Sequence, residues 1–111
     1  NSTKWRIMTL GDHITDSDTQ WFVQEIEFYS DVDCTDDNKI PVNDTKAIDS
    51  NNHGQGWSPD RAFGHYWKWG GLRDDNDMLW IGMEFDDPVS VKCVRVQNSN
   101  KSPASELRVQ A

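Results

Sequence analysis

The amino-acid sequence predicts an all-β fold, an antiparallel β-sandwich with little or no helix, formed as a single domain by residues 1–111. Three observations predict it. The clearest apolar segment alternates with a period of two residues, which is typical of a strand with one buried face. The apolar segments are short and are separated by long polar stretches. No segment longer than about eight residues carries the 3.6-residue apolar period of an amphipathic helix.

The most regular strand is predicted at residues 79–85, where Leu79, Ile81, Met83 and Phe85 share one face. A second strand is predicted at 21–29, with Phe22, Ile26 and Phe28 in phase. Residues 5–10 and 107–109 are weaker strand candidates. Between 79–85 and the valine-rich residues 89–97, Asp86-Asp87-Pro88 is predicted to form a tight turn.

The apolar phase switches near Cys93, since Val89 and Val91 share its face whereas Val94 and Val96 occupy the other. This switch indicates either a bulge or a strand buried on both sides. The remaining polar stretches are predicted to be loops. They are residues 11–20, 31–38, 43–60 and 98–105, together with the non-alternating, glycine-containing residues 57–73.

Composition limits the function classes. The chain is rich in aromatic residues, with six Trp, which disfavours disorder. Its formal net charge of −8 disfavours nucleic acid and anionic membranes, because their phosphates are also negative. A surface of this charge suits cations, neutral ligands such as sugars, or basic protein partners.

The cysteines and sequons favour an extracellular location. Cys34 and Cys93 form no CxxC motif and are either two free thiols or one disulfide that closes a long loop. Asn1, Asn43 and Asn100 each begin an N-x-[ST] sequon for glycosylation. The sequons favour secretion and therefore the Cys34–Cys93 disulfide.

The segment from residue 57 to residue 80 carries four of the six Trp and is the candidate ligand-binding region. Aromatic side chains on loops either close the end of a sandwich core or form exposed platforms. A sugar ring stacks on such a platform with its apolar face, while polar side chains bind its hydroxyl rim. The expected ligand-binding residues are His53, Trp57, His65, Tyr66, Trp67, Trp69, Arg73 and Asn76.

Catalysis has little support in the sequence, so we expect a protein that is not an enzyme. The chain contains neither a G-x-S-x-G nor an H-E-x-x-H motif, and its three His are far apart in sequence. The acidic stretches that begin at Asp31 and Asp74 do not have EF-hand spacing. Irregular calcium sites in the loops remain compatible with the sequence.

The order of several motifs resembles the discoidin, or coagulation factor 5/8 type C, superfamily over about residues 5–111. These motifs are Trp21-Phe-Val-Gln-Glu-Ile-Glu-Phe-Tyr-Ser30, Cys34, Pro59-Asp-Arg-Ala-Phe63, Trp80-Ile-Gly-Met-Glu-Phe85, Pro88-Val89 and Val91-Lys-Cys-Val-Arg-Val-Gln97. The resemblance implies an eight-stranded galactose-binding-like jelly roll whose loops bind ligands. Both cysteines fall where a secreted subgroup has a cysteine pair.

The chain departs from this pattern at two places. The family's Ala-Phe-Asp-Gly element is Ala62-Phe63-Gly64 here, which lacks the Asp that helps to hold a structural Ca²⁺. This departure leaves the calcium site open, and Asp60, Asp74, Asp75 or Asp77 could substitute for the absent Asp as a ligand. The sequence also ends where the family continues to a final strand. Either this copy is shortened, with Glu106 as the C-terminal acidic calcium ligand, or the sequence is a fragment of a longer secreted protein, and we expect the fragment.

Two functions are compatible with the sequence. The first is a non-catalytic extracellular module that binds glycans through its aromatic loops. The second is a structural or adhesive domain that binds an extracellular protein, or neighbouring copies in the same assembly. Binding to anionic membranes is disfavoured, because Arg61, Lys68 and Arg73 are outnumbered by the acidic residues near them.

Overall fold

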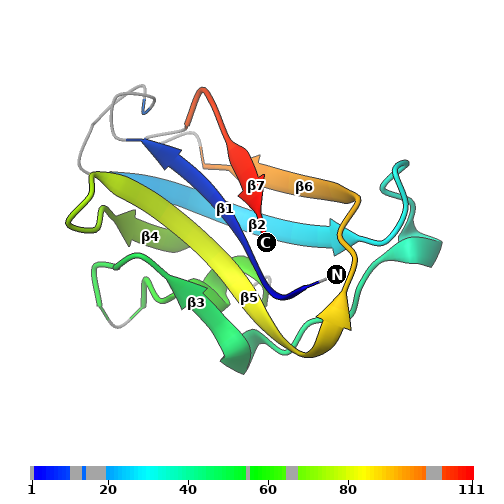
Figure 1. The fold of residues 1–111 in the computed structure, drawn as a ribbon. Coiled ribbons are helices and arrows are strands. Elements are labelled where there is room, and N and C mark those ends of the chain that lie inside the picture. Colours follow the sequence, from blue (N-terminus) through cyan, green and yellow to red (C-terminus); the bar gives the residue numbers. More distant parts are fainter. Residues whose placement is uncertain (1, 11–13, 15–19, 55, 65–67, 100–103) are drawn as a thin grey trace.

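A computed structural model describes residues 2–10, 14, 20–54, 56–64, 68–99 and 104–111 of the chain. They form a sandwich of two antiparallel sheets, as predicted (Figure 1). The four-stranded sheet has the order β3-β5-β1-β7, and the three-stranded sheet has the order β4-β2-β6. The strands are β1 (Ser2–Leu10), β2 (Gln20–Tyr29), β3 (Ala47–Asp49), β4 (Trp69–Leu72), β5 (Met78–Val89), β6 (Cys93–Asn98) and β7 (Arg108–Gln110).

Helical structure in the described residues is limited to three short 3-10 turns. They are η2 (Asp36–Asn38), η3 (Asp44–Lys46) and η4 (Pro59–Ala62). None of the described helices is long and apolar enough to cross a membrane. The described strands number seven, one fewer than the resemblance implies.

The core lies between the inner faces of the two sheets. Leu79, Ile81 and Met83 of β5 are completely buried, which confirms the alternation predicted for this strand. Opposite them, β2 contributes Trp21, Val23, Ile26 and Phe28. This set changes from odd to even positions because the register of β2 against β6 shifts between Val23 and Glu25.

The same bulge overturns one prediction. Phe22 does not share a face with Ile26 and Phe28, because the extra residue after Val23 reverses the alternation. Phe22 pairs with Gly70 of β4 and lies on the outer face of the three-stranded sheet. It is nevertheless only 4% exposed, so other side chains cover it there.

Three further predictions from the local sequence are wrong. Asp86-Asp87-Pro88 does not join two strands: it lies inside β5, at the register shift opposite Ser2–Lys4. The phase switch near Cys93 marks neither a bulge nor a strand buried on both sides. It arises because the valines belong to different segments: Val89 ends β5, whereas β6 begins at Cys93. The segments predicted as loops contain two short strands, β3 and β4, whose polar and glycine residues hide the strand pattern.

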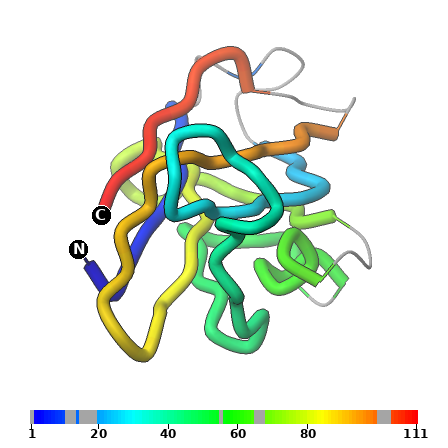
Figure 2. Tube along the Cα trace, turned by 90° about the vertical axis from the view of Figure 1, so that its right-hand side faces the viewer, coloured from blue at the N-terminus to red at the C-terminus, as the bar shows by residue number. Residues whose placement is uncertain are grey.

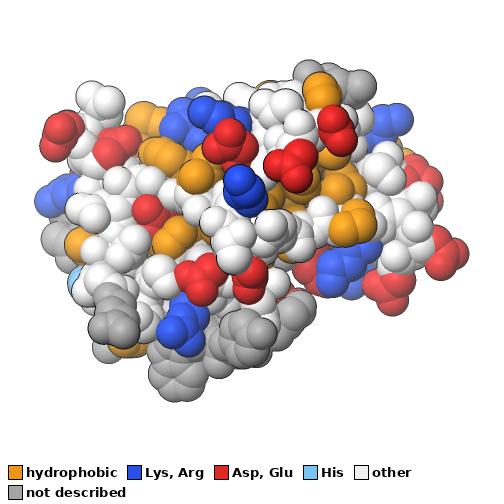
Figure 3. All heavy atoms as spheres, turned by 90° about the horizontal axis from the view of Figure 1, so that it is seen from below, with side chains coloured by type: hydrophobic (Ala, Val, Ile, Leu, Met, Phe, Trp, Pro, Cys, Tyr) orange, Lys and Arg blue, Asp and Glu red, His pale blue; other side chains and the backbone are white. Residues whose placement is uncertain are grey.

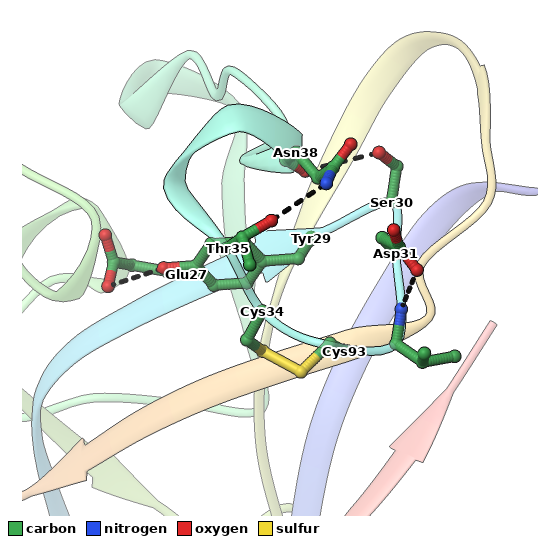
Figure 4. Close-up of a disulfide and its surroundings, with 9 residues drawn as sticks. Glu27, Tyr29, Ser30, Asp31, Cys34, Thr35, Asn38 and Cys93 are labelled. Atoms are coloured by element: carbon green, nitrogen blue, oxygen red, sulfur yellow. Dashed lines mark hydrogen bonds between the residues drawn. A yellow bond between two sulfur atoms is a disulfide. The ribbon is translucent and has the colours of Figure 1, made fainter.

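Cys34 and Cys93 form the expected disulfide (Figure 4). Cys93 begins β6 directly opposite Tyr29, the last residue of β2. The chain then turns through residues 30–38, where the backbone N–H of Ser30 donates to the carbonyl of Asn38 at 2.8 Å. The disulfide therefore fixes this turn to the adjacent strand, β6, at the end of the three-stranded sheet.

Removing the disulfide is expected to destabilise the protein strongly. The two cysteines are 59 positions apart, and a cross-link closing a loop of that length contributes about 4 kcal/mol in the chain-entropy model. In a Cys34→Ala/Cys93→Ala variant, the free energy of unfolding measured by urea denaturation should fall by a large part of this contribution. A reductant should lower the wild-type midpoint to that of the variant and leave the variant unchanged. An unchanged midpoint in the variant would contradict the prediction.

Candidate functional site

Three rings converge on the outer face of the three-stranded sheet and form what we call the aromatic cluster: Phe22, His53 and Trp57. The rings of Phe22 and His53 are nearly parallel, with centroids 5.9 Å apart, and Trp57 meets Phe22 edge-on at 5.4 Å. His53 is exposed and Trp57 is half-buried, whereas Phe22 forms the floor. The cluster thus presents ring surface to solvent above a buried aromatic base.

Gly70 of β4 makes this convergence possible. A Cβ atom at this position would lie 3.0 Å from Phe22, 3.0 Å from Trp57 and 3.1 Å from His53. Glycine in a strand often marks such a close approach, and here the atoms approaching are three aromatic rings. Gly71 has the same role on the inner face, where a Cβ would come within 2.2 Å of the Trp69 ring.

Backbone hydrogen bonds hold the cluster residues against β4. The N–H of His53 donates to the carbonyl of Gly70, and the N–H of Gly70 donates to the carbonyl of Trp57, each at 3.1 Å. Gly54 and Gly56 have φ values of +101° and +91°, which ordinary side chains rarely adopt. His53 and Trp57 are therefore positioned by the sheet as well as by ring contacts.

One basic side chain borders the cluster. The Lys68 amino group lies 5.3 Å from the centroid of the Phe22 ring and 3.4 Å from Oγ of Ser99. A cation over a ring face is attracted by its negative π-surface. The aromatic cluster therefore has an ammonium group beside its apolar ring surface.

The structure divides the predicted ligand-binding residues into four groups. His53 and Trp57 come together in the aromatic cluster, whereas Arg73 and Asn76 lie in the turn between β4 and β5. Trp69 is completely buried and its Nε1 donates to Asp49 at 2.9 Å, so the prediction that it contacts ligand is wrong. His65, Tyr66 and Trp67 lie outside the described residues.

Sequence reasoning missed Phe22, Lys68 and Gly70. Periodicity alone places Phe22 on the core face, because it does not reveal the bulge in β2. A usable signal does exist in Trp21-Phe22-Val23, three consecutive large apolar residues of which one must point outward. The Gly70-Gly71 pair after Trp69 was a second signal, because adjacent glycines in a strand leave both faces open to rings.

The expected calcium ligands do not come together. In the part of the chain that the structure describes, no three His, Cys, Asp or Glu side chains are grouped so that they could hold a metal ion. Asp74 accepts from the N–H groups of Asn76 and Met78, and Asp77 forms an ion pair with Arg73 at 2.6 Å. Asp60 bonds Ser58 in another segment, and Glu106 precedes β7.

Acidic side chains are spread over several separate places on the face shown in Figure 3. Asp60, Asp74, Asp77 and Glu106, all of them described, are therefore not gathered into one group that could hold a metal ion. The carboxylates of Asp74 and Asp77 instead hold the turn between β4 and β5 in its conformation.

A polar network covers the outer face of β2 near the disulfide (Figure 4). Tyr29 Oη donates to Glu27 Oε1 at 3.2 Å, and Lys39 Nζ lies 2.6 Å from Glu27 Oε2. Burial, followed by the negative charge of Glu27, raises the pKa of the Tyr29 phenol. The hydrogen bond to Glu27 raises the pKa of Lys39. Glu27 thus joins the end of β2 to the returning chain at Lys39.

No protein-family model, curated protein or solved structure matches this chain. The resemblance to discoidin domains therefore rests on the quoted motifs, and the function must be inferred from the site itself.

The phenol of Tyr29 is expected to titrate above its ordinary value of 10.0. The absorbance difference between wild type and Tyr29→Phe, followed as pH rises, isolates this transition. Glu27→Gln should lower the pKa of Tyr29, because it removes the neighbouring negative charge. A Tyr29 transition at or below the ordinary value would contradict this prediction.

The same shifts set the direction of alkaline destabilisation. Above pH 10, unfolded tyrosine loses its proton before native Tyr29 does, so stability falls as pH rises through that window. The contribution of Lys39 is complete below its ordinary value of 10.5 and is lost as pH rises through its folded pKa. Urea unfolding at increasing alkaline pH should show a smaller loss in Glu27→Gln than in wild type.

Proposed function

We propose that this protein is a non-catalytic extracellular module that binds glycans through the aromatic cluster. The observation that carries the proposal is the convergence of Phe22, His53 and Trp57 over Gly70, with His53 exposed and Trp57 half-buried. A pyranose ring has an apolar face that stacks on such rings and a rim of hydroxyls that needs polar partners. Lys68 supplies an ammonium group next to the rings.

Rigidity supports a binding role for these rings. Both His53 and Trp57 are tied to Gly70 by backbone hydrogen bonds, and Phe22 is fixed within β2. A site that is already ordered loses little conformational entropy when the ligand binds. The proposal assigns no bond-breaking step to the site, and its residues act only by stacking and hydrogen bonding.

The disulfide and the Asn43 sequon support the extracellular part of the proposal. Disulfides persist mainly in oxidising compartments, and the Cys34–Cys93 bond is part of the folded structure. Asn43 is exposed at the start of η3, and its Oδ1 accepts from the Thr45 hydroxyl of the same sequon at 2.7 Å. Asn1 and Asn100 lie outside the described residues.

Glycan binding should depend on Trp57. A glycan array with neutral and acidic sugars identifies a bound glycan, and calorimetry then measures its affinity for each variant. Trp57→Ala should weaken binding by about tenfold or more, which corresponds to roughly 1.4 kcal/mol of lost stacking. Trp80→Ala is the matched control, because Trp80 is also a half-buried Trp but lies on the outer face of the other sheet. The proposal fails if no glycan binds, or if Trp57→Ala binds like the wild type.

The Asn43 sequon should carry a glycan when the protein passes through a eukaryotic secretory pathway. Enzymatic release of N-glycans followed by peptide mass spectrometry should find Asn43 converted to Asp. Asn43→Gln should lose this glycan without affecting the other two sequons. An unmodified Asn43 in secreted protein would contradict the assignment.

A further inference from the structure

We infer that the glycan carried by Asn43 lies in a hollow beside it, where its first N-acetylglucosamine shields half-buried apolar side chains at the edge of the core. The inference rests on the extracellular part of the proposed function, because it requires Asn43 to be glycosylated. It does not involve the aromatic cluster, which lies on the outer face of the three-stranded sheet. The glycan acts here as a permanent part of the fold.

The first observation is a hollow of about 410 Å³ between two segments that are distant in the sequence. The chain at 40–46, which includes η3, runs beside the second half of β5 (Figures 1 and 2). Residues of both segments line the hollow, and Asn43 is one of them. A glycan on Asn43 therefore starts at the wall of this hollow.

The second observation is the apolar part of the lining. Pro41 is exposed, and Val42, Phe85 and Val89 are only half-buried. The Phe85 ring meets the completely buried Phe28 edge-on, with the ring centroids 6.0 Å apart. Phe85 thus joins the core to the hollow, and an apolar surface placed in the hollow would shield this ring from water.

The third observation is the polar part of the lining. Glu84, Asp86 and Asp87 are exposed residues of β5 that line the hollow, and Lys46 lines it from η3. Carboxylates accept hydrogen bonds, and N-acetylglucosamine offers hydroxyl and acetamide N–H donors. The same sugar has an apolar ring face and an acetyl methyl group, which suit the apolar part of the lining. The hollow therefore has partners for both kinds of group.

The fourth observation is the hydrogen bonding of the Asn43 side chain. Its Oδ1 accepts from the backbone N–H of Thr45 at 3.2 Å and from the Thr45 hydroxyl at 2.7 Å. Within the described part of the chain, Nδ2 donates no hydrogen bond, and this is the atom that carries the sugar of an N-glycan. The amide is thus fixed through its oxygen, while its nitrogen is available for the sugar.

Covalent attachment selects the occupant of the hollow. A sugar joined to Asn43 is held there at an effective concentration that a free ligand seldom reaches. Weak stacking and a few hydrogen bonds are then sufficient to keep it in place. A basic peptide would also meet the three carboxylates, but it would have to displace a sugar that is never released.

The test uses protein secreted from cells that make only high-mannose N-glycans, with Asn1→Gln and Asn100→Gln, so that Asn43 alone begins a sequon. Endoglycosidase H then trims the glycan to one N-acetylglucosamine. In NMR spectra, the acetyl methyl of this sugar should show NOEs to the Phe85 ring and the Val42 methyls. The equilibrium constant for unfolding in urea should be about tenfold lower than in Asn43→Gln, the effect of burying about two methylene groups.

Two variants test the contact itself. Phe85→Ala should remove most of the difference between the trimmed and unglycosylated forms, because the sugar loses its main apolar contact. The matched control moves the sequon: Asn43→Gln with Met78→Thr makes Asn76 its first residue, in the exposed turn between β4 and β5. A trimmed glycan at Asn76 should leave the unfolding constant equal to that of the same chain with Asn76→Gln.

Three results would overturn the inference. One is a trimmed protein without NOEs between the sugar and Phe85 or Val42. Another is an unfolding constant that the Asn43 glycan leaves unchanged, or that an Asn76 glycan lowers equally. The third is equal binding of a lysine-rich peptide at the hollow of the trimmed protein and of Asn43→Gln, which would make a partner the occupant.

Mass spectrometry of the secreted protein separates this inference from the proposed function. An unmodified Asn43 contradicts the extracellular role as well, because both require the glycan. A modified Asn43 without the expected NOEs contradicts this inference alone and leaves the proposed function standing.

Discussion

The packing of Trp69 is the interaction on which the rest of this structure depends. Its indole is completely buried and meets Trp21 edge-on at 5.4 Å. Its Nε1 donates to Asp49 of β3, so one side chain on the three-stranded sheet bonds to the four-stranded sheet. Loss of a buried aromatic side chain of this size costs about 3–5 kcal/mol, which is a large part of the stability of a small domain.

Asp49 extends this link toward the aromatic cluster. The same Oδ2 accepts from the side chain of Asn52 at 2.8 Å, and Asn52 also pairs with Gly71 of β4. The next residue is His53, whose N–H bonds to Gly70. The position of the exposed ring therefore follows from the buried one: Trp69 fixes Asp49, Asp49 fixes Asn52, and the chain continues into the cluster.

The local sequence determined the fold class and several of the strands. Leu79, Ile81 and Met83 alternate with outward-facing residues and are all buried, since a strand with one buried face needs only its own pattern to be recognised. The two cysteines and the sequons were sufficient to predict the disulfide. Trp57 and His53 were also candidates from the sequence, and the structure brings their rings together.

Only the tertiary structure decided which residues of each strand face the core and which meet in space. The bulge after Val23 places Phe22 on the outer face. This bulge depends on how β2 pairs with β6, a strand that is distant in the sequence. Trp69 is buried instead of exposed for two reasons. Gly71 has no side chain and leaves room for the Trp69 ring, and Asp49 accepts a hydrogen bond from the indole N–H. The acidic residues expected at one metal site are instead bound within separate segments of the chain. Periodicity and composition are local properties, whereas register, ring convergence and charge placement depend on pairing between distant strands.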